Sequence, residues 1–366
     1  MADPMPGQPL RVAVVGLGFG VQVHVPALRA CAGTEPVALW HPNPKRLQAA
    51  CAAVDLPGAP TFEALLADPS IDALVLATPP EPRLQLARAA LLAGKHLLLE
   101  KPVTLCAQDA EELQRLALQR RLTVAVDFEY RAVPLFQQLE RLLQQGTLGT
   151  PWLVKLDWLM SSRADPTRPW SWYSQAAAGG GVLGALGTHA FDMLHWLVGP
   201  SRQVQAALST AIPERPLPGN GRMAAVDASD IALVQLELES SAGVAVPAQV
   251  TLASVARHGR GCWLECYGSE ATLVLGSARQ SDYVHGFQLW SGEPGETTLR
   301  ELPVDPHLAF ARTWEDGRIA PVARLMGWWE QAIREGRPMV PGLAEAVASQ
   351  RVCDVAQRSP LPQSRL

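Results

Sequence analysis

Short apolar runs alternate with segments of helical periodicity over the first third of the chain. The runs are rich in valine, leucine and alanine, which is typical of strands buried on both faces of a parallel sheet. Strands separated by helices of this size form right-handed crossovers, so the pattern predicts an α/β fold with helices on both faces of the sheet. The expected strands are residues 11–15, 36–40, 73–77, 96–99 and 123–126, and the expected helices are residues 21–32, 44–54, 62–67, 82–93 and 107–119.

The pattern changes after about residue 130. A helix is expected over residues 134–145, and alternating apolar and polar positions then predict neighbouring antiparallel strands in an open sheet. Residues 213–222 hold three prolines and two glycines, so we expect a surface loop there. The expected strands are residues 154–159, 204–212, 231–238, 243–253, 261–267 and 271–275, and the expected helices are residues 183–198, 309–335 and 342–358.

Composition and charge limit the class of protein. A chain of 366 residues with 48% hydrophobic and 18% charged residues is long enough for two compact domains. The formal net charge of −4 and the absence of a basic block argue against a nucleic-acid partner. The six cysteines lack metal-ligand spacing, so we expect free thiols in a reducing compartment and no metal site.

The N-terminus shows no basic region followed by an apolar core, so no secretory signal is expected. The most apolar long stretch, residues 182–199, contains His189, Asp192 and His195. Polar groups of this kind argue against a membrane span. We therefore expect a cytoplasmic protein.

A glycine-rich turn follows the first expected strand directly. Gly16 permits a sharp turn, and Gly18 lets the backbone approach a diphosphate that the amides of the next helix can face. The strand before the turn and the helical segment after it favour a dinucleotide site over the alternative, an ordinary strand–turn–helix connection.

Two further segments follow expected strands, where ligands bind in such sheets. Thr78-Pro79 follows the third strand, and Glu100-Lys101-Pro102 follows the fourth. Pro102 keeps Lys101 out of the helical region, so the lysine leaves an extended backbone at the ligand edge. There it can hold a substrate hydroxyl and exchange a proton with it. The alternative is a solvated lysine at a turn.

The expected helix over residues 183–198 follows three consecutive glycines. An apolar stripe lies on one face, and His189 and Asp192 fall together on an adjoining arc with Ala185 and Trp196. His189 is a candidate general acid or base, and the alternative is a structural histidine whose hydrogen bonds are satisfied. The aromatic residues Trp170, Trp172 and Tyr173 precede the glycines and are expected either to wall a substrate pocket or simply to pack.

These residues, in this order, resemble the glucose-fructose oxidoreductase/inositol dehydrogenase (Gfo/Idh/MocA) family over nearly the whole chain. The resemblance implies a Rossmann NAD(P)-binding domain over residues 8–130. It also implies an α+β domain over residues 131–359, with an open, mostly antiparallel sheet that makes a homodimer or homotetramer. The motifs that carry the resemblance are Gly16-x-Gly18, Thr78-Pro79, Gly94-Lys95-His96 through Glu100-Lys101-Pro102, the glycines at 179–181, Gly187-x-His189-x-x-Asp192 and Gly336-Arg337-Pro338.

The resemblance also implies an activity, the transfer of a hydride between NAD(P) and a sugar, a cyclitol or a related hydroxyl carbon. Lys101 matches the lysine of the family's Glu-Lys-Pro motif and His189 matches its histidine, and together they would handle the hydroxyl proton. The expected cofactor-binding residues are Gly16, Gly18, Phe19, Gly20, His41, Lys45, Arg46, Thr78, Pro79, Glu100 and Lys101, and the expected substrate contacts are Trp170, Trp172, Tyr173 and Asp192.

Three positions depart from the family pattern. Ala185 stands where the family often has an aspartate, and Glu129 stands where many members carry asparagine. We hypothesise that Glu129 supplies the missing carboxylate as a catalytic group; the alternative is a Glu129–Arg131 salt bridge. Arg83 replaces a common histidine, and the sequence assigns it no role.

The second expected strand lacks the aspartate that would hold the ribose hydroxyls of NAD, because no acidic residue occurs between Glu35 and Asp55. Lys45 and Arg46 can pair with a 2′-phosphate, which predicts NADP(H) over NAD(H). The leading interpretation is thus an NADP-preferring oxidoreductase. Two alternatives stay open: a cofactor-binding sensor with little turnover, favoured by Ala185, and a glycosidase that retains its nucleotide.

Overall fold

The computed structural model describes residues 7–279 and 283–358, and its contacts divide the chain into two compact units. Unit 1 holds the described part of Met1–Ala132 together with Arg312–Val347, and unit 2 holds Val133–Ala311 with the described part of Ala348–Leu366. Segment 312–347 therefore packs with the beginning of the chain although it lies near its end.

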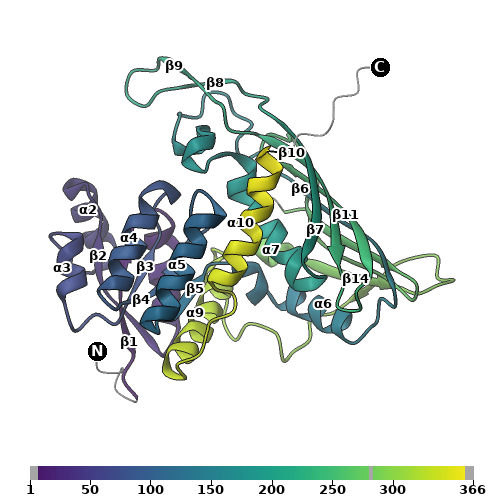
Figure 1. Ribbon diagram of the computed structural model, residues 1–366, viewed down its shortest axis with the longest axis horizontal. Coiled ribbons are helices and arrows are strands. Elements are labelled where there is room, and N and C mark those ends of the chain that lie inside the picture. Colours follow the sequence, from purple (N-terminus) through teal and green to yellow (C-terminus); the bar gives the residue numbers. More distant parts are fainter. Residues whose placement is uncertain (1–6, 280–282, 359–366) are drawn as a thin grey trace. The chain divides into compact units, whose positions relative to one another are not determined.

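Unit 1 is built on a five-stranded parallel sheet with the order β2-β1-β3-β4-β5 (Figure 1). The predicted parallel sheet is confirmed, each strand lying within two residues of its expected bounds. The strand order changes direction at β1, so the switch point, where ligands bind in open α/β sheets, lies between β1 and β3. The strands are β1 (Leu10–Val15), β2 (Thr34–Trp40), β3 (Ala73–Leu76), β4 (His96–Leu99) and β5 (Val124–Val126).

Capping side chains fix where two helices of unit 1 begin. The Asn43 side chain accepts a hydrogen bond from the backbone N–H of Arg46 and caps α2, and Thr61 caps α3 in the same way through Ala64. The expected helix over residues 21–32 divides into a π-helical turn and a short α-helix. The helices between the strands are η1 (Gly20–His24), α1 (Val25–Ala30), α2 (Pro44–Val54), α3 (Phe62–Ala67), α4 (Pro80–Leu92) and α5 (Ala107–Arg120), and η2 (Glu129–Ala132) follows β5.

Two apolar clusters cover the two faces of this sheet. One joins the sheet to α3, α4, α5 and the first residues of α10 (Leu343–Arg358). The other joins it to α1 and to α9 (Ile319–Arg334), whose Leu325 and Trp329 are fully buried. Helix α9 begins ten residues later than the helix expected over residues 309–335. Just before it, the Asp316 side chain accepts the backbone N–H of Arg318 in a turn.

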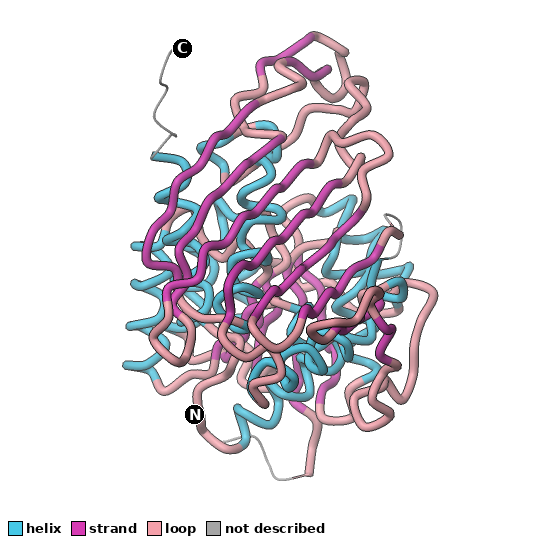
Figure 2. The backbone as a smooth tube through the Cα atoms, turned by 90° about the vertical axis from the view of Figure 1, so that its right-hand side faces the viewer, coloured by secondary structure: helices cyan, strands magenta, loops and turns pink. Residues whose placement is uncertain are grey.

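Unit 2 contains an eight-stranded sheet with the order β15-β14-β13-β12-β6-β11-β10-β7, and Figure 2 shows its strands side by side. Its pairings are antiparallel except that β6 and β11 run parallel, so the expectation of antiparallel neighbours is wrong for this pair. No hairpin joins these two strands, and a long crossover permits parallel pairing. The strands are β6 (Pro151–Leu159), β7 (Ser201–Ser209), β10 (Ile231–Glu239), β11 (Ala245–Ala253), β12 (Gly261–Gly268), β13 (Thr272–Ser277), β14 (Gln288–Gly292) and β15 (Arg300–Leu302).

The segment expected as a surface loop, residues 213–222, is mostly exposed and forms a loop over 217–222, but its first part belongs to a small hairpin. Strand β8 (Glu214–Pro216) pairs with β9 (Met223–Ala225), and Arg215 is buried. Its guanidinium donates to the carbonyl oxygens of Asp165 at 2.8 Å and Arg163 at 2.6 Å. These bonds give the segment a fixed place that prolines and glycines alone do not indicate.

Helices α6 (Pro134–Gln144) and α7 (Thr188–Leu197) bury many of their residues in unit 2. The helix expected over residues 183–198 is interrupted, because Leu183–Gly187 forms the π-helical turn η5 before α7 begins. Along β10 and β11 buried and exposed residues alternate, so one face of the sheet is packed and the other faces solvent. No helix among the described residues is long and apolar enough to cross a bilayer.

Candidate active site

The glycine turn after β1 shows two different reasons for glycine. At Gly16 φ is +106°, and a Cβ would lie 2.4 Å from the carbonyl oxygen of Ala77, so no other residue fits. At Gly18 a Cβ would meet no atom within 4 Å, which leaves the backbone open to a ligand. At Gly20 a Cβ would lie 2.9 Å from Val14 Cγ1. A tight turn followed by an open backbone fits a diphosphate at the switch point.

Strands β3, β4 and β5 end at the same edge of the unit 1 sheet, since all five strands are parallel, and the segments that follow them begin there. This places Thr78-Pro79, Glu100-Lys101 and Glu129 at the edge that also carries the glycine turn. The hydroxyl of Thr78 is buried and makes no hydrogen bond within the described residues. A buried hydroxyl without a partner is suited to meet a polar ligand atom. The cofactor residues predicted after β1, β3 and β4 are thus brought to one edge.

Arg83 fastens two of these segments together. Its side chain is fully buried in α4, and its guanidinium donates to the carbonyl oxygens of Thr78, Glu100 and Pro102. Burial lowers the pKa of Arg83 to about 10, while the neighbouring Glu100 carboxylate opposes this shift. The residue stays charged at neutral pH and holds both loops in register.

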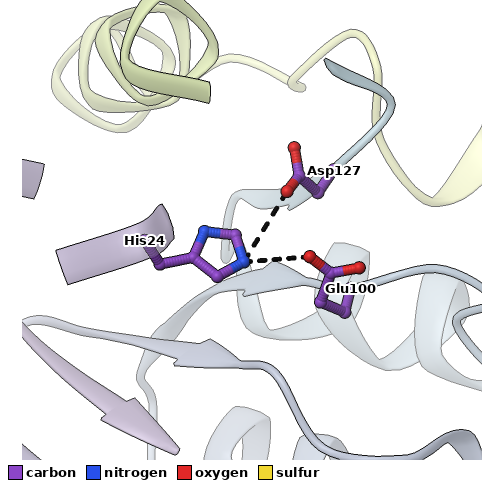
Figure 3. Close-up of side chains that lie close together, drawn as sticks. All are labelled: His24, Glu100 and Asp127. Atoms are coloured by element: carbon purple, nitrogen blue, oxygen red, sulfur yellow. Dashed lines mark hydrogen bonds and ion pairs between the residues drawn. The ribbon is translucent and has the colours of Figure 1, made fainter. Parts of the chain in front are cut away.

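The imidazole of His24 and the carboxyl groups of Glu100 and Asp127 are buried and lie close together (Figure 3). His24 Nε2 donates to Glu100 Oε1 over 3.0 Å and lies 3.6 Å from Asp127 Oδ2. The second carboxylate oxygen of Glu100, Oε2, accepts the backbone N–H of Lys101 at 3.2 Å. Figure 3 shows both carboxyl groups directed at the same ring nitrogen of His24.

The pKa values of the two carboxyl groups are shifted in opposite directions. Burial raises the pKa of Glu100, but the hydrogen bond and charge of His24, with Lys101 and Arg83, outweigh it and bring the pKa to about 2. Burial raises the pKa of Asp127 well above its ordinary value, and the charges of Glu100 and Glu129 raise it further. Glu100 therefore favours its ionised form, and Asp127 favours its protonated form.

Glu129 belongs to the same electrostatic group. It is buried in η2, and burial raises its pKa to about 7; Lys101 and Arg318 oppose the shift, and Glu100 adds to it. Arg318, before α9, lies 5.1 Å from the ring centre of Phe19 in the glycine turn. A carboxyl group with this pKa beside a lysine can exchange a proton near neutral pH.

The residues after β2 form the start of α2. His41 Nδ1 accepts the backbone N–H of Asn43 at 3.0 Å, and burial lowers the pKa of His41. Lys45 and Arg46 lie exposed in the first turn of α2, which contains no acidic residue. This edge of unit 1 is therefore cationic.

The remaining candidates lie in unit 2. His189 and Asp192 are 3% and 2% exposed in α7, and the His189 ring lies 6.3 Å from that of Trp158 in β6. Ala185 is half-buried in η5, so the position that the family often fills with aspartate carries no polar group.

The aromatic candidates before η5 make two kinds of contact, ring packing and a hydrogen bond. Trp172 and Tyr173 have ring centres 6.1 Å apart, and the Arg163 guanidinium lies 4.0 Å over the Tyr173 ring. Trp170 Nε1 donates to the carbonyl oxygen of Ala225 at 3.0 Å, which ties this indole to the β8–β9 hairpin.

Sequence reasoning missed two of the groups at this edge and gave a third no role. Asp127 directly follows β5, and its position after a strand is a signal that could have identified it. His24 gives no such signal, because its partner Glu100 lies 76 positions away. Arg83 was noted as a departure, but its three carbonyl partners come from two separate loops, those after β3 and β4.

Comparisons with known proteins match both parts of the chain. Residues 10–128 match the family described as oxidoreductase family, NAD-binding Rossmann fold, and residues 136–274 match the GFO/IDH/MocA C-terminal domain. The uncharacterized oxidoreductase sll0816 of Synechocystis sp. is 45% identical over 352 residues, which cover 96% of this chain and 94% of that protein.

Two further comparisons concern levoglucosan dehydrogenase. The enzyme of Pseudarthrobacter phenanthrenivorans is 28% identical over 300 residues, covering 78% of this chain and 74% of that protein. A solved structure of levoglucosan dehydrogenase in complex with NADH is similar with a TM-score of 0.83 at 25% identity, covering 96% of this chain and 97% of that chain.

Proposed function

The chain belongs to the Gfo/Idh/MocA family of oxidoreductases, and from this premise we propose that it transfers a hydride between a nicotinamide cofactor and a sugar, a cyclitol or a related small hydroxy or keto compound. A levoglucosan dehydrogenase among its relatives supports a sugar-like substrate. In this proposal residues 8–130 hold the cofactor, and residues 131–359 contact the substrate and join copies of the chain.

One observation carries the proposal: a buried carboxyl group of near-neutral pKa interacts electrostatically with Lys101 at the edge that bears the open glycine turn. The nicotinamide, when bound, accepts the hydride or returns it. The backbone at Gly16, Gly18, Phe19 and Gly20 binds the diphosphate, with Thr78, Pro79 and Glu100 along the same edge.

The protein's own groups move the proton. In the oxidative direction Lys101 Nζ holds the substrate hydroxyl, and the Glu129 carboxylate takes up the proton that leaves it. His189 shares this proton transfer, on the strength of its match to the family's histidine. Asp192, Trp170, Trp172 and Tyr173 are the proposed substrate contacts in unit 2. In the reductive direction the same groups return the proton.

The proposed cofactor is NADP(H), with NAD(H) as the competing form. Its support is the cationic start of α2, where Lys45 and Arg46 are exposed near His41 and no carboxylate lies in the first turn. A 2′-phosphate pairs favourably with such a surface, whereas NAD gains nothing from it.

We also propose that the open face of the unit 2 sheet joins copies of the chain. Leu233 of β10 and Leu153 of β6 are 47% and 36% exposed, and both alternate with the buried residues of their strands, so they lie on this open face. Exposed leucines on the open face of a long sheet favour burial against a second copy.

The test is a panel of sugars, cyclitols and ketones assayed at the nicotinamide absorbance band with NADP and NAD in both directions, beside the Lys101→Ala variant. We expect turnover with an exchangeable cofactor and a loss of roughly a hundredfold or more in Lys101→Ala. Tightly retained, non-exchanging nucleotide would instead support a glycosidase. Cofactor binding without turnover, unchanged by Lys101→Ala, would support a sensor.

A further inference from the structure

His24 connects the glycine turn to the loop that carries Lys101. It is the last residue of η1, which begins at Gly20, and its side chain is entirely buried. The Phe19 ring packs edge-on against it with ring centres 5.1 Å apart. From His24 Nε2 the contact passes to Glu100 Oε1 at 3.0 Å, and from Glu100 Oε2 to the Lys101 backbone N–H at 3.2 Å.

Two buried carboxyl groups facing one imidazole need a positive charge or a proton between them. A metal ion does not fit well, although the three ligand atoms lie within 4.8 Å of one another. A metal-bound histidine normally donates its second ring N–H to a partner, whereas His24 Nδ1 has none in the described part of the chain. The Asp127 side chain is 1% exposed, which leaves little access for the water ligands of an ion. A proton within this cluster, favoured by the raised pKa of Asp127, is the simpler balance.

We propose that His24 is a positioning residue. It holds the Glu100 carboxylate against the Lys101 loop and thereby connects the glycine turn to the group that stabilises the positive charge of Lys101. The inference rests on the proposed function, in which Lys101 handles the substrate proton. Its geometric basis is the continuous path from η1 to Lys101, made of two hydrogen bonds on opposite oxygens of one carboxylate.

Titratable and charged groups from four elements face this path. His24 comes from η1, Arg83 from α4, Asp127 from the end of β5, and Glu129 from η2. Arg318, before α9, and Lys101 act on Glu129. Removing the His24 N–H takes away a hydrogen bond that lowers the pKa of Glu100 and holds its carboxylate in place. The carboxylate can then turn away from the Lys101 loop, and the charged form of Lys101 loses a neighbouring negative charge.

The experiment reads the lysine directly, without turnover. The chain contains four lysines, Lys45, Lys95, Lys101 and Lys155, so lysine labelled with carbon-13 gives few Cε signals in a pH titration by NMR. The Lys101 signal is assigned by its absence in Lys101→Met. In His24→Leu we expect its titration midpoint to fall by about one pH unit. In His24→Gln, whose amide N–H can still donate to Glu100, we expect the midpoint to return toward that of the unaltered chain.

Lys95 is the internal control, since its ammonium group donates to the carbonyl oxygens of Asp68 and Ile71, away from this path. Glu100→Gln provides a second route if His24→Leu folds poorly, and it should lower the Lys101 midpoint in the same way. Nucleotide affinity, measured by fluorescence titration, should change less than about threefold in His24→Gln, because the turn backbone holds the diphosphate.

An unchanged Lys101 midpoint in both His24→Leu and Glu100→Gln would overturn the proposal. A stoichiometric metal ion in the purified protein that is lost in His24→Leu would also overturn it. Failure of the proposed function is seen in a different experiment, as the absence of turnover on every substrate. The Lys101 midpoint is measured without substrate, so it tests the role of His24 whether or not turnover is found.

Discussion

The guanidinium of Arg83 donates to the main-chain carbonyl oxygen of Glu100, the residue before the lysine that we propose to handle the proton. The same guanidinium holds the carbonyl oxygens of Thr78 and Pro102. One buried charge thus fixes the ends of β3 and β4 relative to each other. A histidine at this position, with fewer N–H groups, could not reach all three carbonyls.

Arg83→Met is expected to destabilise the protein by about 3 kcal/mol or more, because three buried carbonyl oxygens lose their donor. Arg88→Met is the matched control on the same helix, since within the described residues Arg88 makes only an exposed ion pair with Glu112. It should cost less than about 1 kcal/mol. Urea unfolding of both variants measures the difference, and equal losses would contradict the role given to Arg83.

Glu129→Gln is expected to remove a pH dependence from both activity and stability. The unaltered enzyme should oxidise its substrate faster as pH rises through about 7, where Glu129 becomes ionised, and the variant should lack this rise and turn over slowly. Full activity in Glu129→Gln would remove the proposed catalytic role.

The same substitution should also change how the stability of the folded protein depends on pH. Between its ordinary pKa of 4.5 and its folded value of about 7, Glu129 keeps a proton in the folded protein that the unfolded chain has released. The folded state therefore loses stability as pH rises through this range. Glu129→Gln should gain roughly 1–3 kcal/mol relative to the unaltered protein on going from pH 5 to pH 8, measured by chemical denaturation at both values.

The two glycines of the turn should separate folding from binding. Gly16→Ala places a Cβ against the Ala77 carbonyl at a φ of +106° and should cost on the order of 2 kcal/mol or more. Gly18→Ala meets no protein atom and should leave stability within about 1 kcal/mol. It should nevertheless weaken nucleotide binding about tenfold or more, because its methyl group occupies the space of the diphosphate. Calorimetric unfolding and nucleotide titration check the pair, and intact binding by Gly18→Ala would argue against the site.

The cofactor preference rests on two side chains. Replacing both Lys45 and Arg46 by serine should lower the affinity for NADPH about tenfold and change that for NADH less than about twofold. The difference should shrink as salt rises, since both groups are exposed. Fluorescence titrations with both nucleotides make the comparison, and tighter binding of NADH than NADPH to the unaltered chain would show the NADP preference to be wrong.

The proposed contact between copies can be tested on the sheet face. Leu233→Glu should reduce the size of the assembly, because it introduces a charge at a leucine that we place in the contact. Leu118→Glu, at a leucine of α5 that is 65% exposed, is the control and should leave the size unchanged. Light scattering after size-exclusion chromatography gives the masses. A monomeric unaltered chain would contradict the proposal.

Sequence periodicity predicted the strands of unit 1 and the glycine turn, because these depend on residues that are neighbours in the chain. It missed β14 and β15, which are short and lie among polar and glycine residues. It also treated residues 183–198 as one regular helix, since a 100° wheel does not describe the wider turn of η5. The pairing of His24 with Glu100 depends on η1 lying against the segment that follows β4, which the local sequence pattern does not encode.

Helix α9 has a consequence for how the chain acquires its structure. Its Leu325 and Trp329 seal the same face of the unit 1 sheet as α1, yet they are synthesised some two hundred residues after that sheet is complete. Until then the emerging segment bears an uncovered apolar surface, a state prone to aggregation. This face of the unit 1 sheet is consequently completed late, when residues 312–347 return to the first part of the chain.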